Sequence, residues 1–158
     1  MTDHHDTEPG KPIIVYDGIC KMCNRSLQFV LSNDSSDQFV YIPFQTEQGQ
    51  LICDHFDIEF TESTSLLLIE YNQILTRSLA WERILSRLSP GYKLLSLVIR
   101  IIPTALNDRL YDYIGRNRYR WFGKSMTCSL ATPNPVPDLD QLGKRLNSNS
   151  GLQPAHNK

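Results

Sequence analysis

The sequence shows little that is typical of a secretory signal or of a membrane-spanning helix. Its 158 residues begin with the acidic, polar stretch Met1 to Gly10, in which no basic region precedes an apolar one, so no secretory signal is visible. Its most apolar long segment, Tyr92 to Ile102, is interrupted by polar and charged residues and is well short of the roughly 20 residues of a membrane-spanning helix. We therefore expect a cytoplasmic protein without a transmembrane segment.

A strong excess of either charge is also missing. The net charge of −1 offers no general electrostatic attraction to nucleic acid or to an anionic membrane. Residues 100–124 are a local exception, because six basic side chains stand there against two acidic ones, with Tyr119, Trp121 and Phe122 among them. This segment is either an RNA or lipid-headgroup surface or, as we favour, an amphipathic helix end whose aromatic side chains pack inward. No nucleic-acid partner is expected.

Cysteine is scarce, and its distribution excludes a disulfide-rich secreted miniprotein. The four cysteines are Cys20, Cys23, Cys53 and Cys128. In a reducing compartment, the close pair Cys20 and Cys23 indicates redox chemistry or metal binding. Cys53 is expected to be a small buried residue of a helix. Cys128 is expected to pack in the C-terminal part, although a third metal ligand or a second resolving thiol are the alternatives.

Length and composition favour one domain with two tails. Residues 1–11 have no large apolar residue beyond the initial methionine and are expected to be disordered. Residues 12–131 then form the domain, including a helical extension at about residues 92–122. Residues 132–158, with several prolines in polar surroundings, are expected to be loose apart from a short helix around residues 139–146.

The apolar pattern predicts a strand–helix–strand unit at the start of the domain. Residues 12–16 form a β-branched run typical of a buried strand, and the Asp-Gly pair that follows ends it with a turn. From Cys20, apolar residues recur at helical spacing as far as the polar cluster at residues 33–37. Residues 38–44 are typical of a second strand. This order predicts a parallel βαβ unit.

The following residues predict a hairpin and more helices. Thr46 is a good N-cap for a second helix, and residues 65–71 and 74–77 are expected to pair as antiparallel strands around a turn at Asn72-Gln73. A third helix, with Ser78 as its expected N-cap, completes a ββα unit. The predicted fold is α/β: a thioredoxin-like βαβ-ββα mixed sheet flanked by helices, with a C-terminal helical extension.

The extension is predicted to contain two helices separated by Pro103. The first covers residues 92–102, and the second covers residues 105–117 with Thr104 as its N-cap. The apolar face expected for the second helix contains Leu106, Leu110, Tyr113 and Ile114.

The position of the C-x-x-C pair favours a redox dithiol over half of a zinc site or two core cysteines. Cys20 opens a helix after a buried strand and a glycine turn, so its thiolate would meet free backbone N–H groups and the positive end of the helix dipole. Cys23 lies one turn later and is expected to be more shielded. We therefore predict that Cys20 attacks a substrate disulfide and that Cys23 resolves the mixed disulfide.

Two neighbours are candidates for tuning the pair. Lys21 adds a positive charge that should stabilise the Cys20 thiolate. Asp17 is either a turn-forming residue or a proton acceptor for Cys23. No cofactor or metal is required. The predicted activity is thiol–disulfide exchange on a protein or small-molecule substrate, with electrons from another cellular reductant. The alternative is a zinc-binding or protein-interaction module in which Cys20 and Cys23 are structural.

The same residues resemble a known family. The run Tyr16-Asp-Gly-Ile-Cys-Lys-Met-Cys-Asn-Arg25 closely resembles the motif of the DCC family of thiol–disulfide oxidoreductases, which is named for an Asp-x-x-Cys-x-x-Cys arrangement, here Asp17, Cys20 and Cys23. The resemblance implies a thioredoxin-like domain with the dithiol as its active site.

Downstream segments extend the resemblance to about residues 12–130. Residues 77–81, and residues 116–123 with a later cysteine, are similar to the family's downstream segments. One difference from thioredoxins concerns the substrate. Thioredoxins place a cis-proline before the third strand, facing the dithiol, whereas this chain has Thr64 and Ser65 there. We expect these two residues to contact the substrate.

Overall fold

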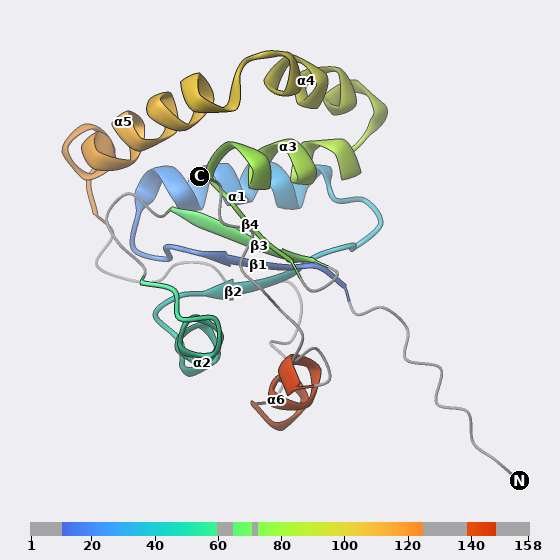
Figure 1. Cartoon of the computed structure of the whole chain (residues 1–158), viewed down its shortest axis with the longest axis vertical. Coiled ribbons are helices and arrows are strands. Elements are labelled where there is room, and N and C mark those ends of the chain that lie inside the picture. The colour runs from blue at the N-terminus through green and yellow to red at the C-terminus, as the bar shows by residue number, and fades with distance from the viewer. Residues whose placement is uncertain (1–10, 60–64, 71–72, 125–138, 148–158) are drawn as a thin grey trace, which may run out of the picture.

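A four-stranded mixed sheet forms the centre of the protein (Figure 1). The computed structural model describes residues 11–59, 65–70, 73–124 and 139–147. The strand order is β2-β1-β3-β4, with β1 parallel to β2 and antiparallel to β3, and β3 antiparallel to β4. The strands are β1 (Ile13–Tyr16), β2 (Val40–Pro43), β3 (Leu66–Glu70) and β4 (Gln73–Thr76).

Helices cover both faces of the sheet. They are α1 (Lys21–Asn33), α2 (Glu47–His55), α3 (Arg77–Arg87), α4 (Pro90–Ile101), α5 (Thr104–Phe122) and α6 (Leu139–Asn147). Figure 1 shows α1 and α3 over one face and α2 and α6 over the other, while α4 and α5 form an outer layer on the α1–α3 side. This architecture confirms the predicted thioredoxin-like fold with a C-terminal helical extension.

Alternation along β1 divides the core into two halves. Ile14 and Tyr16 pack with apolar residues of α1 and α3, whereas Ile13 and Val15 pack with those of α2 and α6. A strand buried on both faces needs apolar side chains at every position, which explains the uninterrupted apolar run at residues 13–16. The dithiol follows directly after this strand.

Two of the three predicted caps are wrong. Thr46 is the N-cap of α2, as expected, and its hydroxyl accepts from the Gly49 N–H at 3.2 Å. However, β4 continues directly into α3, so the N-cap there is Thr76, and Ser78 instead donates its hydroxyl to Asp108 at 2.6 Å. In α5 the N-cap is Pro103, and Thr104 is the first helical residue. Helix α3 starts earlier than expected because it follows β4 without a loop, and α5 starts earlier because Pro103 is its N-cap.

The face expected to be buried on α5 is right for Ile114, which faces inward, and wrong for its other three residues. Leu106, Leu110 and Tyr113 are 60%, 58% and 59% exposed. The side of α5 turned toward the protein carries Tyr111, Ile114, Gly115 and Arg118. Apolar residues surround most of this helix, so periodicity alone does not select the buried side. The choice matters, because it brings Arg118 into the interior.

The C-terminal region is partly docked to the sheet. Leu142 of α6 is fully buried among the apolar residues between α2 and the sheet, so the short helix expected near residues 139–146 is present and is not loose. The remaining parts of the predicted tails, residues 1–10, 132–138 and 148–158, lie outside the described residues, as do Tyr71 at the end of the first predicted hairpin strand and Asn72 of the predicted turn. Within the described chain, none of the helices has the length and apolar character needed to cross a membrane.

Candidate functional site

Cys20 and Cys23 meet at the start of α1, directly beyond the carboxyl end of β1. Cys20 is the N-cap residue of α1, and its Sγ accepts from the Cys23 backbone N–H at 3.2 Å. Both residues are free thiols in this structure. The turn before the helix is held by Asn24, whose side-chain amide donates to the Gly18 carbonyl at 3.0 Å. The helix terminus thus supplies an N–H donor to the first sulfur, as the strand–turn–helix pattern predicts.

Both thiols are buried, and their relative exposure differs from our expectation. Cys20 is 0% exposed and Cys23 is 7% exposed, so the greater shielding expected for Cys23 is not seen in their exposed fractions. The cover over Cys20 comes from the residues after α5. Cys20 pairs with Lys124 in an isolated antiparallel bridge, and the Lys21 N–H donates to the Gly123 carbonyl at 3.5 Å.

The pKa values of the two thiols are shifted in opposite directions. The pKa of Cys20 is lowered to about 7, chiefly because the Cys23 thiol donates a hydrogen bond to it, with smaller contributions from the Cys23 N–H and the Arg118 charge. Burial and Asp17 oppose this shift. The pKa of Cys23 is raised far above its ordinary value by the hydrogen bond to Cys20 and by burial. Cys20 is therefore the thiol that ionises near neutral pH.

A buried ion pair lies beside the dithiol. Arg118 of α5 is 1% exposed and donates through Nη2 to Asp17 Oδ2 at 2.8 Å. Its Nη1 lies 3.7 Å from Cys23 Sγ. Burial by itself lowers the pKa of the Arg118 guanidinium, but Cys23, Tyr119 and Asp17 outweigh it and raise that pKa. Arg118 therefore keeps a full positive charge next to the sulfurs.

Arg118, rather than Lys21, is the cation that acts on the thiols. Lys21 is exposed, and it is not among the groups that shift the pKa of Cys20. Tyr119 completes the surroundings of Arg118, because its hydroxyl accepts from Nη2 at 3.0 Å and donates to Asp17 Oδ2. Burial and the bond to Asp17 raise the pKa of Tyr119 to about 12, so this hydroxyl stays protonated.

The Asp17 carboxylate is fully engaged with groups other than the thiols. Oδ1 accepts from the Ile19 N–H at 3.1 Å and from the Gln45 side-chain amide at 2.8 Å, while Oδ2 accepts from Arg118 and Tyr119. The bond to Ile19 is that of a turn-forming Asp. The four hydrogen bonds of Asp17 go to groups other than the thiols, and its charge raises the pKa of both sulfurs, in opposition to Arg118.

Three residues of this site were absent from the sequence-based prediction: Gln45, Arg118 and Tyr119. Arg118 follows Tyr111, Ile114 and Gly115 at helical spacing, so a basic residue on the buried stripe was the available signal. Gln45 comes just after β2, and the carboxyl ends of parallel neighbours such as β1 and β2 lie side by side.

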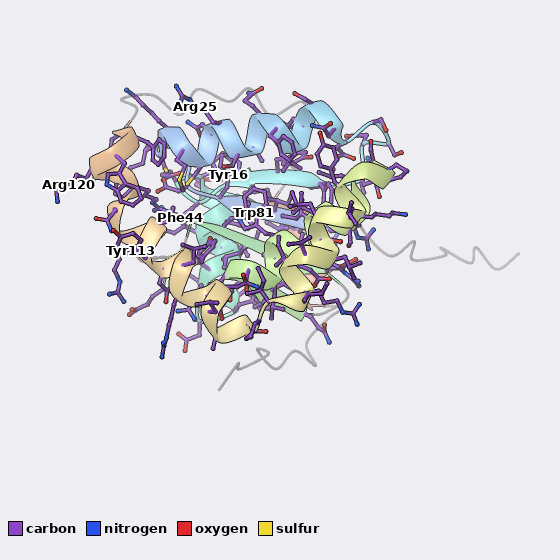
Figure 2. All side chains as sticks on the ribbon, turned by 90° about the horizontal axis from the view of Figure 1, so that it is seen from above. Tyr16, Arg25, Phe44, Trp81, Tyr113 and Arg120 are labelled. Atoms are coloured by element: carbon purple, nitrogen blue, oxygen red, sulfur yellow. The ribbon has the colours of Figure 1, made fainter. Side chains whose placement is uncertain are left out.

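A cavity of about 250 Å³ opens next to Cys23. It lies between α1, β3, α3 and α5, and most of its wall is aromatic or aliphatic. Its lining includes Met22, Cys23, Ser65, Trp81, Tyr111 and Ile114. Figure 2 shows Tyr16 and Trp81 within this part of the molecule. The cavity reaches Cys23 and does not include Cys20 in its lining.

Ser65 belongs to the wall of this cavity and is buried. Its hydroxyl forms a hydrogen bond with the Tyr111 hydroxyl, and its carbonyl accepts from the Asp17 N–H at 3.2 Å. Thr64, the other residue expected to contact substrate, lies outside the described residues, as does Cys128. Cys53 is buried on the opposite face of the sheet, where burial raises its pKa to about 11. Across the described ranges, no group of three or more Cys, His, Asp or Glu side chains could hold a metal ion.

Comparison with known proteins agrees with the site. A family model described as DCC1-like thiol-disulfide oxidoreductase matches residues 14–124. The uncharacterized protein YuxK of Bacillus subtilis is 30% identical over 122 residues, which cover 77% of this chain and 88% of that protein. A chloroplastic DCC family protein of Arabidopsis thaliana is 27% identical over 78% of this chain and 72% of its own length. No solved structure matches.

Proposed function

Because the chain belongs to the DCC1-like thiol–disulfide oxidoreductase family, we propose that it exchanges thiols and disulfides through Cys20 and Cys23. The observation that carries this proposal is the difference between the two sulfurs. One thiol has a pKa of about 7, while its neighbour, one helical turn away, is held protonated and donates a hydrogen bond to it. This combination suits a nucleophile and a resolving thiol.

In the proposed reaction, the Cys20 thiolate attacks one sulfur of a substrate disulfide. The substrate S–S bond breaks, a mixed disulfide forms on Cys20, and the first substrate sulfur leaves as a thiolate. Cys23 then attacks Cys20 Sγ and gives up its proton to the departing substrate sulfur, which leaves as a thiol, and a Cys20–Cys23 disulfide remains. A cellular thiol reductant returns two electrons and restores the dithiol.

Arg118 and Asp17 support this chemistry by position and charge. Arg118 lies 3.7 Å from Cys23 Sγ and lowers the pKa of both thiols, so it favours the thiolate at each step. Asp17 neutralises Arg118 and fixes its direction through the 2.8 Å bond. We assign Asp17 this anchoring role, in preference to accepting the Cys23 proton itself, because its oxygens already accept four hydrogen bonds.

Substrate access requires a displacement at the cover of Cys20. The hydrogen bond between Lys21 and Gly123 is 3.5 Å long, at the weak end of the range, so a small shift of residues 123–124 would uncover Cys20. The cavity beside Cys23 would then receive an apolar group next to the substrate disulfide, with Ser65 in its wall. We propose protein or small-molecule disulfides as substrates, in the cytoplasm or another reducing compartment.

Trapping of the mixed disulfide tests the assigned roles. The full-length Cys23→Ser variant should form a stable adduct with a disulfide substrate such as a dithiobis-nitrobenzoate or glutathione disulfide, because no resolving thiol remains. Mass spectrometry should find the adduct on Cys20. The Cys20→Ser variant should form much less adduct at Cys23 at neutral pH, because burial still raises the pKa of Cys23 after the hydrogen bond to Cys20 is lost.

The matched control is Cys53→Ser, which removes a buried thiol on the other face of the sheet and should leave adduct formation unchanged. If the adduct formed on Cys23 in preference to Cys20, Cys23 would be the nucleophile, and the assigned roles would be contradicted. A bound, stoichiometric zinc ion with no reactive thiol would instead support the metal-binding alternative.

A further inference from the structure

The outer layer of the protein has a large exposed apolar surface. Along α4, the side chains of Leu94, Leu97, Val98 and Ile101 follow one another at helical spacing and are 68%, 49%, 48% and 74% exposed. Along α5, Leu106, Leu110 and Tyr113 do the same at 60%, 58% and 59%. We call these seven residues the α4–α5 face. Exposed apolar side chains that recur along two successive helices mark an interaction surface.

Both stripes lie on the sides of their helices that point away from the core. On α4 the inward side carries the buried Ser96 and the half-buried Tyr92 and Ile99, which pack toward α1 and α3. On α5 the inward side carries Gly115 and Arg118. The α4–α5 face is therefore not required by the core of the domain.

The charges around this face are of one sign. Exposed cations lie along both helices: Lys93, Arg100, Arg109, Arg116 and Arg120. In Figure 2, which looks down on this layer, Arg120 points away from the body of the protein. Helix α4 contains no acidic residue. The two acidic residues of α5 are engaged with α3, Asp108 by Ser78 at 2.6 Å and Asp112 by Arg77 at 3.1 Å.

Exposed aromatic side chains are added at the end of α5. Trp121 and Phe122 are 50% and 41% exposed, and the Trp121 ring lies 5.6 Å from the ring of Tyr113. The expectation that the aromatic residues of this segment pack inward is therefore wrong for these two. Trp and Tyr side chains favour the boundary between lipid headgroups and acyl chains.

From these observations we propose that the α4–α5 face binds the surface of an anionic lipid membrane. The apolar stripes enter the headgroup–acyl boundary, and the surrounding cations contact acidic headgroups. A nucleic acid would leave the leucine and isoleucine side chains exposed to water. A second copy of the chain, in a two-fold pair, would bring the same cations against each other. The membrane is the partner that satisfies both the apolar residues and the charges.

Sedimentation of the full-length protein with lipid vesicles tests this proposal. We expect binding to vesicles with about one-third phosphatidylserine, and binding at least about tenfold weaker to pure phosphatidylcholine or at high salt. Trp121 provides a second signal, because its fluorescence should shift to the blue when the ring leaves water. The other tryptophan, Trp81, lines the inner cavity and should change little.

Three variants separate the contributions. Leu97→Glu combined with Ile101→Glu should abolish binding, and Arg109→Glu combined with Arg116→Glu should weaken it about tenfold or more. Both pairs change exposed side chains, so the fold should persist, as circular dichroism can verify. The matched control is Leu51→Glu on α2, which changes a leucine that is 37% exposed on the opposite side of the sheet and should leave vesicle binding intact.

Several results would overturn the proposal. Equal binding to neutral and anionic vesicles would remove the role of the cations, and binding that survives both variant pairs would place the contact elsewhere. No vesicle binding, together with a dimer in analytical ultracentrifugation that Leu97→Glu with Ile101→Glu dissociates, would identify a second copy as the partner. A monomer that binds no vesicles would equally contradict it. None of these outcomes depends on disulfide exchange, so the two proposals fail independently.

Discussion

At Cys20, two hydrogen-bond donors and one positive charge lower the pKa of the thiol, against burial and the charge of Asp17. The Cys23 thiol contributes most to its lowered pKa, the Cys23 N–H contributes next, and the Arg118 charge adds to both. The first two are local and follow from the C-x-x-C spacing at a helix start. The third depends on a residue nearly the whole domain away in sequence.

The pH dependence of Cys20 reactivity follows from this arrangement. Since only the thiolate reacts, alkylation of Cys20 in the reduced protein should accelerate as pH rises through about 7 and reach a plateau above it. In Cys23→Ala, the main donor is lost and the midpoint should move up toward the ordinary thiol value. Rates of iodoacetamide labelling, resolved by residue in a mass spectrometer, measure both midpoints. An unchanged midpoint in the variant would contradict the assigned cause.

Removal of the Arg118 charge should also raise the pKa of Cys20. A rise of one unit lowers the thiolate fraction at pH 7 about fivefold, and disulfide exchange should slow accordingly in Arg118→Met. Because Asp17 would then be a buried, unpaired carboxylate, the free energy of unfolding should fall by about 3 kcal/mol or more. The titration of thiolate ultraviolet absorbance measures the pKa, and urea unfolding measures the stability.

Two further variants make that result interpretable. Arg118→Lys keeps the charge and should keep most of the pKa shift even though it loses a paired hydrogen bond. Arg25→Met removes an exposed arginine of α1, labelled in Figure 2, and should change neither the pKa nor the stability. Equal effects of Arg118→Lys and Arg118→Met would show that packing, and not charge, is responsible.

At the scale of single elements, local patterns predicted most of the structure. Three local features predicted elements within a few residues of themselves. The apolar run before the dithiol predicted β1, Thr46 predicted the start of α2, and the change of period at Cys20 predicted the start of α1. The buried pair of Asp17 and Arg118 could not be predicted this way, since it joins residues 101 positions apart. The prediction of the buried side of α5 was wrong for most of its residues for the same reason, because tertiary contacts determine which side of the helix is buried.

Helix α2 packs closely against the end of β2 at Gly49, which gives a prediction for single elements. A Cβ at Gly49 would lie 2.7 Å from the Phe44 Cα and close to the Pro43 carbonyl, so Gly49→Ala should reduce the free energy of unfolding by about 2 kcal/mol. The matched control is Gly91→Ala in α4, where nothing lies within 4 Å of an added Cβ. That change should be neutral or stabilise by up to about 1 kcal/mol. Similar losses in both variants would contradict the close packing.

At the scale of the whole molecule, the two faces of the sheet carry different groups. The α1–α3 side holds the dithiol, its arginine and the cavity, while the α2–α6 side holds the second cluster of buried apolar residues. The C-terminal region contributes to the α2–α6 side, where Leu142 of α6 is fully buried. Leu139, Leu142 and Leu146 recur at helical spacing, so the sequence indicates a short helix, but this pattern does not show which element the helix packs against.

Leu142→Ala tests this division. Loss of a fully buried leucine should lower the free energy of unfolding by about 2–4 kcal/mol, as measured by urea denaturation. The exchange rate of the folded protein should be unchanged, because the dithiol lies across the sheet. Leu139→Ala, at a position that is 36% exposed, is the control and should cost less than about 1 kcal/mol. A slower exchange in folded Leu142→Ala would show that the two faces are coupled.

The most direct test of the central claim is the redox equilibrium of the purified full-length chain in glutathione buffers of graded potential, with each cysteine followed by alkylation and mass spectrometry. We predict that Cys20 and Cys23 are oxidised together in one two-electron transition, while Cys53 stays reduced throughout. Because the lowered pKa of Cys20 stabilises the reduced form, Arg118→Met should shift this transition toward more reducing potentials. A pair that never oxidises, or that exchanges only after a stoichiometric zinc ion is removed, would contradict the account.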